Sequence, residues 1–165
     1  MRSNAQEKYK FSLNSRGKLG YSPDKFFLVV SQGKDVLLYT SDSKYETVSR
    51  RLEGHREEVT SIDLSPSGDF LISGSLDNKV ILWDYKKGLS IKTIATSEDV
   101  LDVKFIDQWR FAYMTETSVT VYDINENREL FVRKDGKKPF RSLVATGDGK
   151  YLAVGGGEGI IYAYY

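Results

Sequence analysis

Short stretches of alternating or continuous apolar residues, separated by turn-forming residues, run along this chain of 165 residues. The clearest example lies within residues 54–84, where Val59–Leu64 alternates between apolar and polar side chains. Residues 70–73 and 80–83 are short apolar runs that contain β-branched and aromatic side chains. The connections between these runs carry the Pro, Gly, Asp and Asn that tight turns favour. The pattern predicts three short β-strands joined by turns.

Residues 54–84 begin with Gly54-His55 and end with Trp83-Asp84. With these ends, and with an Asp in the second turn, the segment resembles a WD40 repeat, the four-stranded blade of a β-propeller. The resemblance implies a buried hydrogen-bonded set of one His, one Ser or Thr, one Asp and one Trp. Each satisfied bond in such a set contributes about 1 kcal/mol, whereas an orphaned buried partner costs more. The residues at the matching positions are His55, Ser73, Asp77 and Trp83.

The same plan of strands and turns recurs before and after this segment. Tyr39, Tyr122 and Tyr164 fall at the position of Trp83, so the copies repeat at roughly the 40 to 45 residues of WD40 arrays. In the first copy Gly33 stands at the position of Asp77, which predicts that the hydrogen-bonded set is missing there. We expect an all-β fold with four antiparallel, four-stranded propeller blades per chain. The predicted blades are residues 16–50, 54–95, 100–133 and 140–165, the last without its own outer strand.

A spare strand precedes the first blade. Residues 8–13 alternate cleanly between apolar and polar side chains and belong to no blade downstream. WD40 propellers commonly close when an N-terminal strand completes the last blade, so the resemblance implies that residues 8–13 pair with residues 140–165. Closure removes an exposed strand edge, which is an aggregation liability. The propeller unit is then residues 7–165, and residues 1–6 are expected to be disordered.

Four blades are fewer than the ring of about seven that the resemblance implies, so half of a larger ring is the expected architecture. Half a ring leaves two blade faces open, each of roughly several hundred Å² of apolar surface. Three arrangements stay open. Two copies join into an eight-bladed ring by exchanging closing strands, a different partner supplies the missing blades, or the sequence is a fragment or a closed four-bladed ring.

The amino-acid composition excludes several classes of function. The net charge of +1 favours neither nucleic acid nor a membrane, and the absence of Cys excludes disulfides, Cys-zinc sites and thiol catalysis. The single His is already assigned to the buried set, so no imidazole remains for a catalytic triad or a metal site. We therefore expect no enzyme activity, no metal and no cofactor. No apolar run approaches the roughly 20 residues that span a bilayer and no secretory signal opens the chain, so a cytoplasmic or nuclear protein is expected.

The resemblance also implies a binding surface. Partners of WD40 rings commonly dock on the face formed by the loops before the first strand and between the second and third strands of each blade. We expect a non-catalytic scaffold that presents this face to peptide or protein partners in a multiprotein assembly. The residues predicted on it are Arg51, Arg56, Glu58, Leu76, Asp99, Thr115, Lys137, Lys138 and Phe140.

Basic pairs suggest an alternative function of another class. Arg50-Arg51, Arg133-Lys134 and Lys137-Lys138 lie in or beside the predicted loops. Concentrated on one face of a near-neutral protein, such pairs attract an acidic peptide or a phosphate backbone. The alternative is therefore an RNA- or phosphate-binding propeller, and a steep salt dependence of RNA binding would favour it.

Overall fold

The computed structural model describes residues 17–134, 139–146, 148–156 and 161–164 of the chain. Within these ranges the backbone forms strands, turns and loops, and no stretch is helical. The strands form four antiparallel sheets, of which three have four strands and the last has three. The predicted all-β fold of antiparallel propeller blades is therefore confirmed.

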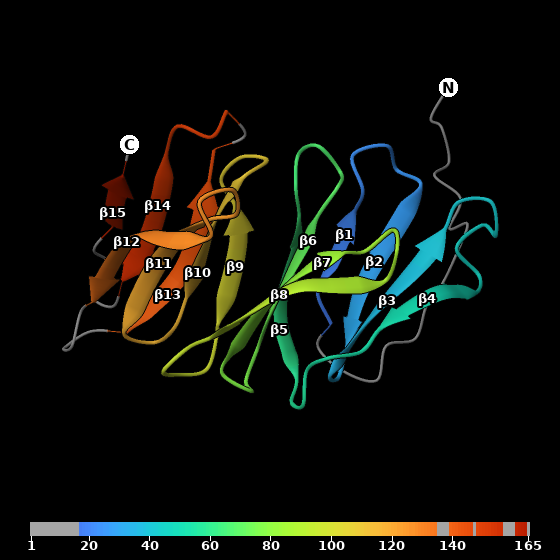
Figure 1. The fold of residues 1–165 in the computed structure, drawn as a ribbon, viewed down its shortest axis with the longest axis horizontal. Helices are drawn as coiled ribbons and strands as arrows, with labels where there is room; N and C mark the ends of the chain where they lie inside the picture. The colour runs from blue at the N-terminus through green and yellow to red at the C-terminus, as the bar shows by residue number, and fades with distance from the viewer. Residues whose placement is uncertain (1–16, 135–138, 147, 157–160, 165) are drawn as a thin grey trace, which may run out of the picture.

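Each blade is a meander in which every strand pairs with its neighbours in the sequence (Figure 1). Blade 1 contains β1 (Leu19–Tyr21), β2 (Phe27–Gln32), β3 (Asp35–Thr40) and β4 (Val48–Leu52). Blade 2 contains β5 (Val59–Leu64), β6 (Leu71–Ser75), β7 (Lys79–Asp84) and β8 (Leu89–Ala95). Blade 3 contains β9 (Asp102–Phe105), β10 (Arg110–Met114), β11 (Ser118–Asp123) and β12 (Arg128–Lys134). Blade 4 contains β13 (Phe140–Ala145), β14 (Leu152–Gly156) and β15 (Ile161–Tyr164).

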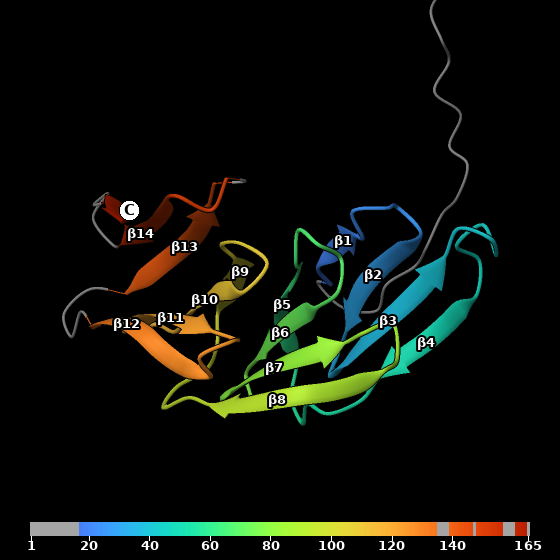
Figure 2. The same cartoon turned by 45° about the horizontal axis from the view of Figure 1, so that its top comes forward.

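The blades stand side by side along an arc. Figure 2 shows the outer strands β4, β8 and β12 along one side of the arc and the first strands β1, β5, β9 and β13 along the other. The first strands of neighbouring blades contact one another. This is the arrangement of a propeller, in which the first strands surround the axis.

One backbone hydrogen bond recurs at every junction between blades. In each case a residue at or just before the first strand donates its N–H to the preceding blade, where the second strand ends or the hairpin after it turns. The pairs are Val59 to the Gly33 carbonyl at 2.8 Å, Val100 to the Ser75 carbonyl at 3.1 Å, and Phe140 to the Glu116 carbonyl at 2.9 Å. The bond therefore brings the loop before each first strand and the preceding hairpin to the same edge of the molecule.

Each junction also buries its own apolar cluster, which explains why several strands are apolar on both faces. Trp83 and Leu71 pack between blades 1 and 2, Phe111 packs between blades 2 and 3, and Met114 packs between blades 3 and 4. All four side chains are at most 2% exposed. Full burial of such a side chain contributes about 1.5–3 kcal/mol, so the stacking of blades stabilises each of them.

A register shift marks equivalent positions in the first three blades. It falls between Leu38 and Tyr39, between Leu82 and Trp83, and between Val121 and Tyr122. In each blade it lies where the third strand pairs with the outer strand. The β-bulge therefore aligns Tyr39 and Tyr122 with Trp83, in agreement with the repeat read from the sequence.

Among the described residues, β15 is the last strand of blade 4. Its sheet has the order β13-β14-β15, and the Ile161 side chain on β15 is 73% exposed. The predicted closing strand at residues 8–13 and the predicted disordered segment at residues 1–6 lie outside the described residues. Pairing of residues 8–13 with blade 4 thus stays a prediction.

Candidate functional site

Four side chains of blade 2 form one hydrogen-bonded chain. Trp83 on β7 donates from Nε1 to Oγ of Ser73 on β6 at 2.9 Å. The same Oγ lies 2.8 Å from Nε2 of His55, and Nδ1 of His55 lies 3.1 Å from both carboxylate oxygens of Asp77. Ser73 is 0% exposed and His55 is 5% exposed. The structure therefore brings together the four residues that the repeat pattern singled out.

The hydrogen-bond donors of this set bear on the protonation state of the His55 imidazole. An indole N–H can only donate, so Ser73 accepts from Trp83; with a neutral imidazole, the Ser73 hydroxyl donates a hydrogen bond to Nε2 of His55. Nδ1 of His55 then carries the ring proton and donates it to Asp77, which makes the contact a hydrogen bond to a neutral imidazole. Burial lowers the pKa of His55 below its usual 6.5, against the carboxylate of Asp77, which raises it. Burial of the imidazole therefore favours its neutral form in this hydrogen-bonded set.

The hydrogen-bonded set of His55, Ser73, Asp77 and Trp83 also holds a surface loop in place. Oδ2 of Asp77 accepts the backbone N–H of Arg56 at 2.9 Å. Close by, Oγ of Ser75 accepts the N–H of Asp77 at 3.1 Å and donates to the carbonyl of Glu57 at 3.2 Å. These bonds tie residues 55–58 to the hairpin between β6 and β7. A loop that is fixed in this way loses little conformational entropy when a partner binds.

Blades 1 and 3 lack this chain of bonds. In blade 1, Gly33 occupies the position of Asp77 and offers no carboxylate. In blade 3, Tyr122 replaces Trp83, and its hydroxyl donates to Oδ1 of Asn127 at 2.7 Å, away from the junction core. The hydrogen-bonded set is thus a property of blade 2 among the three blades whose hairpins are described.

In blade 3 the loop supplies the carboxylate and the hairpin supplies the hydrogen-bond donors. Oε1 of Glu98, in the loop before β9, accepts the hydroxyl of Thr117 at 2.6 Å, and Oε2 accepts the backbone N–H of Thr117 at 3.1 Å. These bonds hold the pKa of Glu98 below its usual range. In blade 2 the hairpin supplies the carboxylate, whereas in blade 3 the loop supplies it. Sequence reasoning missed this pair, and an acidic residue before a first strand opposite a hairpin Thr is the signal that could have found it.

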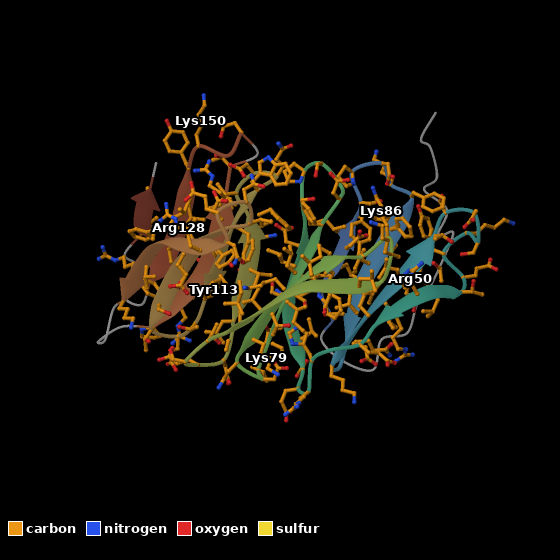
Figure 3. All side chains as sticks on the ribbon, in the orientation of Figure 1. Arg50, Lys79, Lys86, Tyr113, Arg128 and Lys150 are labelled. Carbon is orange, nitrogen blue, oxygen red and sulfur yellow. The ribbon has the colours of Figure 1, made fainter. Side chains whose placement is uncertain are left out.

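We use the term loop face for the edge that carries residues 55–58, the β6–β7 hairpin and residues 96–101. In Figure 3 the labelled Lys79 lies toward this edge at the bottom, and Lys150 lies at the top. Lys86 follows the far end of β7, the strand that begins at Lys79. Five of the residues predicted to meet a partner have exposed side chains at or beside this face. They are Arg51, Arg56, Glu58, Leu76 and Asp99.

Two other predicted contact residues are buried. Thr115 and Phe140 are each 1% exposed. Oγ1 of Thr115 lies 2.8 Å from Oγ of Ser118 inside the hairpin of blade 3, and Phe140 packs in the cluster between blades 3 and 4. The prediction that these two side chains face a partner is corrected, because both serve the packing of blade 3. Lys137 and Lys138 lie outside the described residues.

The basic pair of β4 does not form one patch. Nη1 of Arg50 donates to the carbonyl of Lys87 at 2.8 Å, in the turn after β7. Arg51 instead binds Oδ2 of Asp35 at 2.7 Å, at the start of β3. Neighbouring residues of a strand point to opposite faces, so Arg50 reaches across to blade 2 whereas Arg51 stays within blade 1. Adjacent basic residues on a strand therefore do not add up to an anion site here.

Neither a metal centre nor a membrane segment is found in the part of the chain that the structure describes. Across the described ranges, no group of three or more His, Asp or Glu side chains is placed to hold a metal ion. The same ranges contain no helix long and apolar enough to cross a bilayer.

Known proteins share both the sequence pattern and the fold. A family model described as PAC11 dynein intermediate chain matches residues 29–141. The target of rapamycin complex subunit wat1 of Schizosaccharomyces pombe is 27% identical over 152 residues, which cover 89% of this chain and 48% of that protein. The WD repeat-containing protein SL1-17 of Schistosoma mansoni is 30% identical over 115 residues, which cover 67% of this chain and 38% of that protein. The chain thus spans less than half the length of either relative.

A solved structure shows the same fold. The crystal structure of the Cps50 (Swd1) β-propeller domain of Myceliophteria thermophila superimposes with a TM-score of 0.79 at 24% sequence identity. The match covers 88% of this chain and 49% of that one, and at this identity it bears on the fold alone. The family model covers more than half of the chain, and the structure consists of antiparallel propeller blades. The chain therefore belongs to the PAC11 dynein intermediate chain family of WD40-repeat β-propellers.

Proposed function

We propose that this chain is a non-catalytic scaffold that binds a protein or peptide partner on the loop face, as part of a multiprotein assembly. The observation that carries the proposal is the attachment of residues 55–58 to the β6–β7 hairpin by Asp77, which fixes the backbone of Arg56. A rigid loop with exposed side chains is a prepared binding surface, because little order has to be gained on binding. We expect the protein to act in the cytoplasm or the nucleus.

The side chains on this face suit a protein better than a phosphate backbone. Arg56 brings one positive charge, Glu58 and Asp99 bring two negative charges, and Leu76 is 37% exposed among them. Mixed charge around an apolar side chain is the usual composition of a protein interface, whereas nucleic-acid surfaces are strongly basic. The relative wat1 is named as a subunit of a larger complex, which supports the same kind of role here.

Site-specific crosslinking tests the proposal. A photo-crosslinking residue placed at Leu76 is expected to form adducts with protein partners in cells of the source organism. The same residue placed at Lys86, beyond the end of β7 that lies away from Leu76, is the matched control and is expected to form none of these adducts. Equal adducts at the two positions would contradict the proposal. RNA adducts at Leu76 with a steep salt dependence would favour the alternative function instead.

We further propose that the β15 edge of blade 4 is completed by a strand of a second copy, as in the predicted eight-bladed ring. A groove of about 440 Å³ lies beside this edge and is lined by Leu130, Phe131, Tyr151 and Leu152. Phe131 pairs with Val121 on β11, and the equivalent outer-strand residues of blades 1 and 2 are Arg50 and Lys92. An apolar residue where the other blades carry a charge supports a covering partner. The solution mass should be twice 18.7 kDa, and a monomer would contradict strand exchange.

A further inference from the structure

A second hollow, of about 330 Å³, lies between blades 2 and 3. Its walls come from the end of β8 and the loop that follows it on one side, and from β10, β11 and β12 on the other. Figure 3 labels Tyr113, which stands in this region between the two blades. The polar side chains that matter for its chemistry are Thr96, Ser97, Tyr113, Ser118, Glu129 and Lys134.

The hollow occupies the position that the imidazole fills in blade 2. Thr96 lies four residues before Val100, whose N–H makes the junction bond (100 − 96), and His55 has that place in blade 2. Tyr113 stands at the position of Ser73. Ser73 pairs with the residue two before Trp83, and Tyr113 pairs with the residue two before Tyr122. A threonine is much shorter than a histidine, so blade 3 has lost the side chain that closes the corresponding junction. The space that remains is lined by polar groups.

The charge in and beside this hollow is negative overall. The hydroxyl of Tyr113 donates to Oε1 of Glu129 at 2.7 Å and so holds the carboxylate at the wall. Oε2 of Glu129 has no hydrogen-bond partner among the described residues. Glu98 adds a second carboxylate, whose pKa stays low because Thr117 donates to it, and Lys134 supplies one positive charge. Two carboxylates and one ammonium group leave a net charge of −1.

We propose that this hollow binds one guanidinium group, that is, the head of an arginine side chain. A guanidinium is a planar cation with five N–H donors and no acceptor, so it suits a fixed carboxylate oxygen flanked by hydroxyl oxygens. Oε2 of Glu129 and the hydroxyls of Ser97 and Ser118 are acceptors of this kind. That the arginine belongs to a partner docked on the loop face depends on the proposed function. That the hollow binds a guanidinium group does not depend on it.

A small probe tests the hollow without the partner. We would titrate N-acetyl-L-arginine methylamide into the whole ¹⁵N-labelled chain and follow the amides of Ser118 and Thr120 by NMR. Glu129→Gln is expected to weaken binding roughly five- to tenfold, because a hydrogen bond to a charged group is lost. Lys134→Gln is expected to tighten binding by about twofold, because a nearby like charge disappears. The two substitutions thus have opposite predicted signs.

A matched control keeps the change in charge but moves it away from the hollow. Glu126→Gln removes a carboxylate that binds Nε of Arg128 at 2.6 Å in the turn before β12, and it should leave the affinity for the probe unchanged. Equal binding of the neutral citrulline analogue would overturn the proposal, as would stronger binding of inorganic phosphate or a reversal of the two signs. Probe binding without adducts at Leu76 would keep this inference and reject the proposed function.

Discussion

Blades 2 and 3 attach the same loop to the same hairpin by different chemistry. In blade 2, Asp77 of the hairpin accepts the N–H of Arg56 and is itself held by a buried imidazole. In blade 3, Glu98 of the loop accepts the N–H of Thr117, and the buried Thr115, without an imidazole, stands behind this carboxylate. In both of these blades a carboxylate joins the loop to the hairpin, although a different element supplies it. The buried set of blade 2 is one of two arrangements that make this connection.

The two blades differ in how far the loss of one side chain affects the hydrogen bonds of the others. Removing one side chain of the blade 2 set leaves the others buried without a partner, and an orphaned buried polar group costs about 1–3 kcal/mol. In blade 3 the bonds of Tyr122 and Glu98 do not share a partner, so each can be lost alone. Blade 2 should therefore respond to substitution strongly, and blade 3 weakly.

The largest effect is expected for Trp83→Ala. The side chain is 2% exposed in the junction between blades 1 and 2, so its loss leaves a cavity and removes the donor to Ser73. The free energy of unfolding, measured by urea denaturation, should fall by about 3–5 kcal/mol. A loss below about 1 kcal/mol would show that this junction is not a packed core.

Asp77→Ala comes next and can be compared directly with Thr117→Ala. Without the carboxylate, Nδ1 of His55 and the N–H of Arg56 both lose their acceptor. The free energy of unfolding should fall by about 1–3 kcal/mol, against roughly 1 kcal/mol or less for Thr117→Ala, whose backbone N–H still reaches Glu98. Equal losses in the two variants would contradict the proposed difference between the blades.

Acid should weaken blade 2 before the carboxylates titrate. The folded pKa of His55 lies below its unfolded value of 6.5, so the unfolded state takes up the proton first. Stability from this group is therefore complete above pH 6.5 and is lost as the pH falls below it. The melting temperature should drop as the pH falls below 6.5, before ordinary carboxyl groups titrate. His55→Asn is the control, and an identical drop in that variant would assign the effect to other groups.

The smallest effect is expected for Tyr122→Phe. The ring keeps its packing against Phe111, with centroids 5.4 Å apart, and only the bond to Asn127 is lost. The free energy of unfolding should fall by about 1 kcal/mol or less. A loss as large as that of Asp77→Ala would show that this hydroxyl belongs to a buried network.

Much of the fold could be predicted from the sequence, because turn residues and strand patterns act locally. The positions of His55, Ser73, Asp77 and Trp83 could be named from one repeat, and the structure brings them together. Contacts between blades were harder to foresee. The burial of Thr115 and Phe140 depends on how blade 3 packs against its neighbours, which no single repeat encodes.

The candidate site was less accessible to sequence reasoning than the fold. Arg50 and Arg51 looked like a basic pair, but strand geometry sends them to Lys87 and Asp35. The hollow between blades 2 and 3 arises from a missing imidazole, and an absent side chain leaves no motif to recognise. Such features become visible only when equivalent positions of two blades are compared in space.

Amide hydrogen exchange at Arg56 tests the central claim most directly. We expect this amide to be protected in the native chain, because it donates to Asp77, and we expect Asp77→Ala to speed its exchange at least about tenfold, the loss of roughly 1.4 kcal/mol. The amide of Thr117, held by Glu98, should keep its exchange rate in the same variant and serves as the internal control. Unprotected exchange at Arg56 in the native chain would contradict the claim that the buried set of blade 2 fixes the loop face.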